Sequence, residues 1–136
     1  IEFHAFQEDE AAALDAYLKS LEPAPSPRLR DGRLSEAAGR GGALFDKAGC
    51  ADCHPPPLFT DMKKYDVGAG VGPETNRVFD TPTLVESWRT APYLYNGAAG
   101  TMREVLTIHN RGDRHGITSG LTDRELDDLA EYVLSQ

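Results

Sequence analysis

The sequence predicts an all-α fold with few helices and long loops between them. Apolar residues recur at spacings of three and four in several short stretches, which is the pattern of helices with one buried face. Segments rich in proline and glycine separate these stretches. The motif Cys50-Ala51-Asp52-Cys53-His54 has the C-x-x-C-H spacing of a c-type haem attachment site. We therefore expect a small domain wrapped around one covalent haem.

Cys50, Cys53 and His54 carry the chemistry of this motif. Two thiols about one helical turn apart can each form a thioether to a haem vinyl group, and the adjoining His54 then reaches the iron as proximal ligand. A structural zinc site would need four ligands, and the chain has only two cysteines, with its other histidines distant in sequence. A redox dithiol would precede a helix, which Pro55-Pro56-Pro57 opposes. The motif therefore favours haem c.

Composition excludes other classes of function. The 136 residues carry a net charge of −8 and form no basic stripe, so nucleic acid is not an expected partner. No uninterrupted apolar run is long enough to span a membrane. Because c-type cytochromes mature outside the cytoplasmic membrane, we expect a periplasmic or other extracytoplasmic location. A chain that begins at Ile1 is expected to be a fragment whose targeting segment has been removed.

The first third of the chain predicts a helix and then a linker. From Glu8 to Leu21 the apolar stripe is helical, and it ends before Pro23. Residues 22–33 are rich in proline and should be extended and semi-rigid. We therefore expect residues 1–21 to be a separate helical tail, residues 22–33 a linker, and residues 34–136 the haem domain.

Two further helices are predicted to pack against each other. Ser35 should cap a helix that runs to about Lys47 and stops at Gly49, with Gly41 and Phe45 on one face. The last helix begins with the capping box Thr122-Asp123-Arg124-Glu125. Its apolar stripe consists of Leu126, Leu129, Ala130 and Val133, with Tyr132 alongside. We expect close approach at Gly41, an arrangement that resembles the crossed terminal helices of class I cytochromes c.

Between these helices the sequence predicts long loops. Residues 55–80 should form a loop that wraps the haem. Thr81 or Thr83 can cap a short helix through Trp88 that Pro92 ends. Asn96-Gly97 should form a turn. Thr101 can then cap a helix from Met102 to about His109 or Asn110, closing near Gly112.

The second axial ligand of the iron decides the chemistry of the haem. Met102 and His109 are seven residues apart, about 10 Å along a helix, so they should not bind one iron together. Met102 fits an ordinary core position, and Met62 follows His54 too closely to reach the opposite face readily. His115 lies in a loop and remains an alternative. The candidates are Met62, Met102, His109, His115 and, more remotely, Tyr93 and Tyr95.

An internal echo favours His109 over His115. Leu106-Thr107-Ile108-His109 precedes a helix with Leu129, Tyr132 and Ser135; Ile1-Glu2-Phe3-His4 precedes one with Leu14, Tyr17 and Ser20 at the same spacings. We interpret residues 1–21 as the tail of a preceding, homologous haem domain whose body is missing. His4 would then correspond to His109.

Residues 79–106 resemble the C-terminal haem domain of the di-haem cytochrome c peroxidase family, including its MauG-type members. With the haem motif, the resemblance covers about residues 34–136. In the C-terminal domain of that family, the distal iron ligand is a Met or a Tyr eight residues after a motif threonine. Thr101 matches this threonine, so His109 stands at the ligand position in this chain. The resemblance therefore implies a bis-histidine haem of lower potential than a His/Met haem. The matching positions are Thr81-Pro82-Thr83-Leu84, Ala91-Pro92-Tyr93, Gly97, Thr101 and Glu104-Val105.

The resemblance carries two further implications. Tyr95 stands where the family commonly has a histidine. The family also binds calcium between its two domains, partly through carbonyls at positions like Thr90 and Pro92. Since the other domain is absent from this sequence, that site would be incomplete, and calcium is not expected here.

Three functions follow, of which the weakest is a sensor or adaptor domain whose haem is mainly structural. The first is electron transfer by a single low-spin haem c, ligated by His54 and His109, with a redox partner protein or a neighbouring haem domain as partner. The alternative is that the intact protein is a di-haem peroxidase or a MauG-type oxidase acting on hydrogen peroxide. Peroxide chemistry needs an open or displaceable iron position, and in the resembling family the peroxide-reactive haem lies in the other domain. No catalytic residue is therefore assigned to this fragment.

Overall fold

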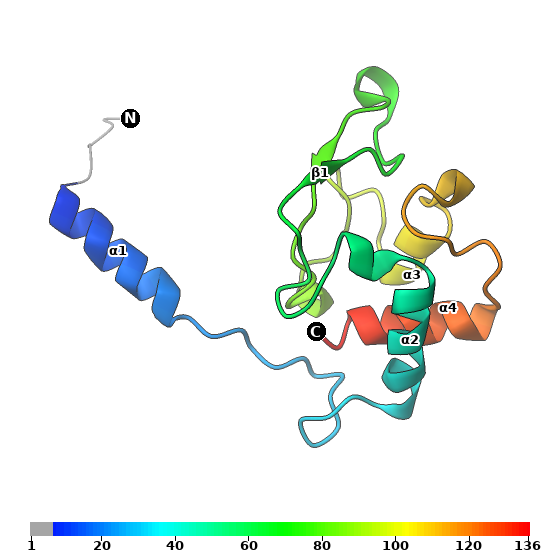
Figure 1. Cartoon of the computed structure of the whole chain (residues 1–136), viewed down its shortest axis with the longest axis horizontal. Helices are drawn as coiled ribbons and strands as arrows, with labels where there is room; N and C mark the ends of the chain where they lie inside the picture. Colours follow the sequence, from blue (N-terminus) through cyan, green and yellow to red (C-terminus); the bar gives the residue numbers. More distant parts are fainter. Residues whose placement is uncertain (1–6) are drawn as a thin grey trace.

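The computed structural model describes residues 7–136, which form a mostly helical domain with one helix standing apart from it (Figure 1). The α-helices of this part are α1 (Glu8–Ser20), α2 (Glu36–Lys47), α3 (Met102–Leu106) and α4 (Asp123–Val133). Short 3₁₀ turns occupy Cys50–Asp52, Gly72–Glu74, Ser87–Arg89 and Arg111–Asp113. The predicted all-α fold with long loops is confirmed.

Helices α2 and α4 cross at the centre of the domain, as predicted (Figure 1). At the crossing Gly41 faces the backbone of Asp128 and the side chain of Tyr132, so no side chain fits between the helices there. The guanidinium of Arg40 donates to both carboxylate oxygens of Asp128, at 2.7 and 2.8 Å. The two helices are therefore joined by close packing and by a forked ion pair.

The predicted caps of these helices are present. The Ser35 hydroxyl accepts from the Ala38 amide at the start of α2. At the start of α4 the Thr122 hydroxyl accepts from the Glu125 amide, and the Glu125 carboxylate accepts from the Thr122 amide. Gly49, with φ of 77°, ends the α2 segment in the left-handed region that favours glycine.

The core lies between α2, α3 and α4 and reaches into the loop after the haem motif. Leu129 of α4 is fully buried at its centre. Phe45, Phe59 and Tyr132 form a group of three tilted rings with centroids 5.2 to 6.3 Å apart. The buried cluster comprises Leu44, Phe45, Phe59, Ala99, Met102, Val105, Leu106, Leu126, Leu129, Ala130 and Val133.

Helix α3 is shorter than predicted. It starts at Met102 with the predicted Thr101 cap but ends at Leu106, not at His109 or Asn110. The Thr107 hydroxyl donates to the carbonyl of Arg103, and Thr107 itself has left helical geometry, with φ of −123° and ψ of −83°. Two features explain this early end. Thr107 and Ile108 are both β-branched, and the Thr107 hydroxyl competes with backbone amides for a helix carbonyl.

Residues 55–80 contain a short hairpin that the sequence pattern did not indicate. Strands β1 (Lys64–Tyr65) and β2 (Phe79–Asp80) pair antiparallel, with Lys64 opposite Asp80 and Tyr65 opposite Phe79. Strands of two residues are too short to show an alternating apolar pattern. The expectation that residues 55–80 form a loop throughout was therefore wrong for these four residues.

Helix α1 projects away from the domain (Figure 1) and buries none of its residues. Leu14, Tyr17, Leu18 and Leu21 of its apolar stripe are exposed. The interpretation of residues 1–21 as the tail of a preceding domain stays a prediction, and His4, on which the echo depends, lies outside the described residues. In residues 7–136 the structure has no helix long and apolar enough to cross a membrane.

The linker after α1 is held against the domain. The Ser26 hydroxyl is buried and donates to the Leu134 carbonyl at the end of α4. The Ala24 amide donates to the Glu86 carboxylate, and Arg28 pairs with Glu131. The segment is therefore fixed to the domain by hydrogen bonds. The expectation of an extended linker is wrong for its second half, where the chain turns at residues 27–28 and again between Arg30 and Arg33, whose backbones hydrogen-bond to each other.

Candidate haem-binding site

A cavity of about 360 Å³ opens beside the C-x-x-C-H motif. Its size falls in the range of cofactor sites, roughly 300 to 1,000 Å³. Most of its walls are apolar or aromatic, and the polar groups are few. Among the residues that line it are Phe45, Cys50, Cys53, His54, Tyr65, Phe79, Tyr93, Tyr95, Met102, Val105, Leu106, Arg114 and His115.

The haem motif forms a tight turn at the edge of this cavity. The His54 amide donates to the Cys50 carbonyl at 2.9 Å, which brings both thiols and the imidazole to one side. Both cysteines are free and half-buried. Burial raises the pKa of the Cys50 thiol to about 11. Redox dithiols need a lowered thiol pKa, so this environment does not fit that alternative.

His54 is prepared to act as a neutral ligand. Its ring is buried, and its Nδ1 lies 2.9 Å from the carbonyl oxygen of Phe59. Donation from Nδ1–H to that carbonyl leaves Nε2 with a free lone pair and fixes the orientation of the ring. Burial lowers the pKa of His54, although the carbonyl partner opposes this effect. A neutral imidazole is the form that binds a metal.

His115 faces His54 across the cavity. The two ring centroids are 6.3 Å apart, and the ring planes are inclined by 40°. Burial, and then the proximity of His54, lowers the pKa of His115 to about 4. Burial thus favours the neutral form of both imidazoles, which is the form that can bind a metal.

The residues present fit a haem iron held between the two rings. A metal–nitrogen bond of about 2 Å on each side, with about 1.1 Å from nitrogen to ring centre, requires about 6 Å between centroids. The observed 6.3 Å meets this requirement. The thiols of Cys50 and Cys53 at the edge and the apolar walls complete a donor set suited to covalent haem.

The other predicted ligand candidates are placed differently. His109 is half-buried, does not line the cavity, and donates its amide to the Glu104 carbonyl. Its role as ligand stays a prediction. Met62 is 82% exposed and also lies outside the lining. Met102 is buried in the core, as predicted, and its side chain also contributes to the wall of the cavity.

The two tyrosine candidates also line the cavity but have other partners. The Tyr93 hydroxyl donates to the Ser87 carbonyl at 2.9 Å. Tyr95 stacks on Phe79, with centroids 4.6 Å apart. Among the described residues, no group of three or more His, Cys, Asp or Glu gathers in a way that would hold another metal ion. The expectation that the carbonyls of Thr90 and Pro92 do not bind calcium stays a prediction.

Sequence reasoning did not identify Tyr65 and Asp61. Tyr65 lies on β1 and lines the cavity, and its hydroxyl donates to the Asp61 carboxylate at 2.7 Å. This hydrogen bond is the main cause that lowers the pKa of Asp61 to about 2 and raises that of Tyr65 to about 12. The charge of Asp61 also acts on His54. Their spacing of four residues carried no signal in a stretch taken for a loop.

Crossed helices, a C-x-x-C-H turn and a facing pair of histidines define a c-type cytochrome-like domain. The comparisons with known proteins agree with this class. The chain is homologous to hydrazine synthase subunit gamma, to cytochrome-c peroxidases and to the methylamine utilization protein MauG. No family model matches the sequence.

The similarity extends over most of this chain. It is 33% identical to hydrazine synthase subunit gamma of Kuenenia stuttgartiensis, over 89% of this chain and 47% of that protein. It is 30% identical to a cytochrome-c peroxidase of Denitromonas iodatirespirans, over 74% of this chain and 40% of that protein. It is 31% identical to MauG of Methylorubrum extorquens, over 74% of this chain and 34% of that protein.

A solved structure of the Kuenenia stuttgartiensis hydrazine synthase, pressurized with xenon, contains a chain of similar fold. The TM-score is 0.80 at 32% identity, over 96% of this chain and 56% of that chain. The present chain thus spans about half the length, or less, of the curated relatives it matches. Homology to cytochrome-c peroxidases and MauG indicates a haem-related redox role.

Proposed function

We propose that this domain transfers single electrons through one covalently bound, low-spin haem c with His54 and His115 as axial ligands. The observation that carries the proposal is the 6.3 Å separation between the ring centroids of the two imidazoles across a cofactor-sized cavity. Two histidine nitrogens would then bind the iron and leave none of its positions open for substrate, which suits electron transfer.

The residues of the chain have separate roles in this proposal. Haem c supplies the one-electron redox centre. Cys50 and Cys53 hold it through thioethers, and His54 binds its proximal face in the orientation set by the Phe59 carbonyl. His115 closes the distal face. The apolar walls keep water from the centre, which lowers the reorganisation that accompanies a change of charge.

The proposal selects His115 in place of His109, which the internal echo favoured. His115 lines the cavity and faces His54, whereas His109 does not line it. Both assignments give a bis-histidine haem and differ only in which segment brings the distal ring. The choice can therefore be made with two single substitutions.

The experiment is a comparison of His115→Ala and His109→Ala in haem-loaded protein by visible absorption and electron paramagnetic resonance. We expect the parent and His109→Ala to be low-spin, and His115→Ala to become high-spin and to bind cyanide rapidly. A low-spin His115→Ala combined with a high-spin His109→Ala would reverse the assignment. A high-spin parent protein would contradict the electron-transfer proposal and favour the peroxide-reactive alternative.

We further propose that the domain works outside the cytoplasmic membrane, because covalent haem attachment takes place there in c-type cytochromes. Its partner would be a redox protein or a neighbouring haem domain of the full-length protein. The exposed stripe of α1 supports the second option, because Leu14, Tyr17 and Leu18 lack a partner in the described residues. Any peroxidase-like or oxidase-like activity of the full-length protein would then receive electrons through this haem.

A further inference from the structure

His115 lies in a loop, residues 110–119, which is stabilised by the buried polar side chains of Asn110 and Thr118. Asn110 is 7% exposed and Thr118 is 5% exposed. Buried polar side chains are costly unless their hydrogen bonds are made, so a satisfied buried pair fixes the local backbone.

The side chain of Asn110 makes three hydrogen bonds within this loop. Its Oδ1 accepts from the backbone amide of His115 at 2.8 Å. Its Nδ2 donates to the carbonyl of Gly116 at 2.8 Å and to the hydroxyl of Thr118 at 2.7 Å. The side chain of Asn110 is therefore hydrogen-bonded to the backbone of both His115 and Gly116.

Thr118 links the Asn110 side chain to the end of α3. Its hydroxyl accepts from Asn110 and donates to the carbonyl of Leu106 at the end of α3, at 2.8 Å. The carboxylate of Asp113 accepts from the amides of Thr118 and Ser119 and from the Ser119 hydroxyl. The loop is thus tied both to itself and to the helix before it.

The same loop is fixed against the haem motif. The Ile117 amide donates to the carbonyl of Ala48 at 2.9 Å. Gly116 has φ of 84°, and a Cβ there would lie 3.3 Å from both the Ala48 carbonyl oxygen and the Cys50 sulfur. Only glycine fits this approach without strain. The segment that carries His115 is therefore held at a set distance from the segment that carries His54.

We propose that Asn110 is the positioning residue for the distal ligand: through its three hydrogen bonds it sets where His115 stands and thereby keeps the iron six-coordinate. The inference rests on the proposed function, in which His115 binds the iron. With its backbone held on both sides, the imidazole of His115 has only its own two torsions free. Little conformational entropy then remains to be lost when it binds the metal.

The test is to measure distal-ligand strength in haem-loaded Asn110→Ala and Thr118→Val. Cyanide must displace the distal ligand, so its apparent affinity reports how firmly His115 is held. Residues behind a metal ligand change its affinity roughly 10- to 100-fold. We expect a gain in cyanide affinity of that order for Asn110→Ala, a smaller gain for Thr118→Val, and a high-spin fraction in the ferric spectrum. Thr118→Ser, which keeps the hydroxyl, should behave like the parent.

Two controls separate positioning from a general loss of stability. Asp128→Asn weakens the α2–α4 ion pair far from the loop and should lower the melting temperature without changing cyanide affinity. In a His115→Ala background, Asn110→Ala should change cyanide affinity no further, since it acts through His115.

Three results would overturn the inference. The first is parent-like cyanide affinity and a fully low-spin spectrum in folded Asn110→Ala. The second is a cyanide response in Asp128→Asn equal to that of Asn110→Ala at the same loss of melting temperature. The third is an undiminished effect of Asn110→Ala in the His115→Ala background. If His115→Ala itself stays low-spin, the proposed ligand is wrong, and that failure is distinct from a failure of Asn110 alone.

Discussion

A Cβ atom on Gly41 would lie 2.0 Å from the backbone carbonyl oxygen of Asp128, far inside van der Waals contact. Gly41 is buried at the point where α2 crosses α4, whereas Gly39, two residues earlier, has nothing within 4 Å of the same position. One helix therefore contains a glycine that the fold requires and one that it does not.

Gly41→Ala should lower the free energy of unfolding by about 3 kcal/mol or more, because it overpacks a helix crossing that has no room to relax. Gly39→Ala should be neutral or stabilising by up to about 1 kcal/mol, since alanine is the better helix former. Denaturant unfolding of the two haem-loaded variants measures both effects. Equal effects of the two substitutions would contradict the close approach.

The Arg40–Asp128 pair should make stability depend on pH. The hydrogen bond from Arg40 lowers the pKa of Asp128 below its ordinary value of 3.8. The pair therefore contributes its full stabilisation above pH 3.8, and this contribution is lost as the pH falls through the lowered pKa of the folded state. Asp128→Asn should melt lower at pH 7 and lose less stability on acidification than the parent does. Asp15→Asn, on the exposed α1, should follow the parent at each pH.

Covalent attachment through both cysteines can be tested chemically. Haem should remain with the protein after acid-acetone extraction and on a denaturing gel, because thioethers survive both treatments. Replacing Cys50 and Cys53 together with alanine should release any haem that the cavity still binds. Haem that is extractable from the parent protein, despite correct maturation of a control c-type cytochrome in the same cells, would refute the attachment.

Asp61 should influence the reduction potential of the haem. Its carboxylate stays ionised, with a pKa of about 2, and its charge acts on His54. A negative charge stabilises the ferric state, so Asp61→Asn should raise the potential. The rise should be roughly tens of millivolts, because the ammonium of Lys63, 3.6 Å from the carboxylate, offsets part of its charge. Redox titration of the holoprotein measures this shift. Asp15→Asn is the matched control and should leave the potential unchanged.

Removing α1 should not affect the haem domain. Since none of its residues is buried, a chain that starts at Glu22 should keep the melting temperature and spectrum of the parent. Ser26→Ala, by contrast, should cost about 1 kcal/mol, because the buried hydroxyl of Ser26 donates to the Leu134 carbonyl. Thermal unfolding of both holoproteins tests the pair. A large loss on removal of α1 would mean that its apolar face has a partner within this chain.

Local chemistry made much of the fold predictable. Ser35, Gly49 and the Thr122–Glu125 box each signal a helix end through hydrogen bonds that span only three or four residues. The crossing at Gly41 was also foreseeable, because a glycine on an apolar helix face has few other uses. These features depend on near neighbours in sequence, which a single chain displays.

The parts that were missed depend on distant contacts. The β1–β2 hairpin joins residues fifteen or so apart through strands too short to show a period. The choice between His109 and His115 stays a prediction, and it too depends on a distant contact, that of Ile117 and Gly116 with Ala48, about seventy residues earlier. The internal echo compared local patterns, and such a comparison carries no information about that contact.

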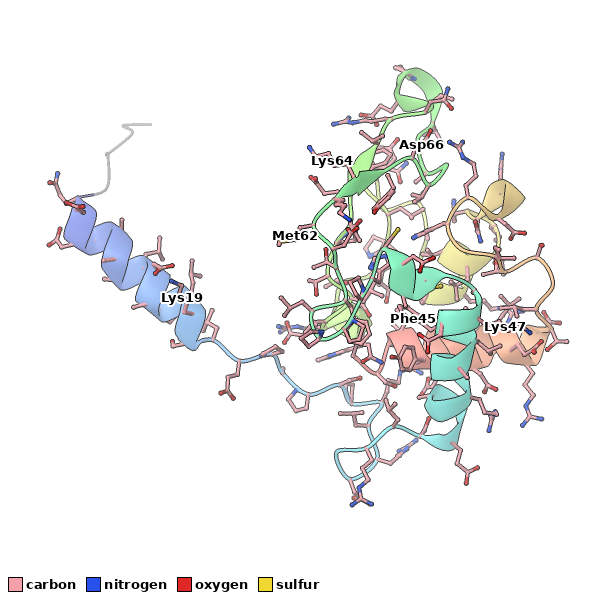
Figure 2. The ribbon with its side chains drawn as sticks, viewed as in Figure 1. Lys19, Phe45, Lys47, Met62, Lys64 and Asp66 are labelled. Atoms are coloured by element: carbon pink, nitrogen blue, oxygen red, sulfur yellow. The ribbon has the colours of Figure 1, made fainter. Side chains whose placement is uncertain are left out.

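Tyr65 was missed for the same reason. Its importance comes from the wall it contributes to the cavity and from its hydrogen bond to Asp61. In the sequence it is one aromatic residue within a stretch rich in turns. Only the fold shows that Tyr65 lines the same cavity as His54. Met62, Lys64 and Asp66 mark this stretch in Figure 2.

The hydrogen-bonded linker between α1 and the haem domain has a mechanical consequence. Ala24, Ser26 and Arg28 are each hydrogen-bonded to the domain, so this part of the linker cannot swing freely. A partner bound to the exposed stripe of α1 would then be joined to the haem domain through only the short segment 21–23. Its effective concentration beside the domain would be high, so successive electron transfers would not each need a new encounter by diffusion.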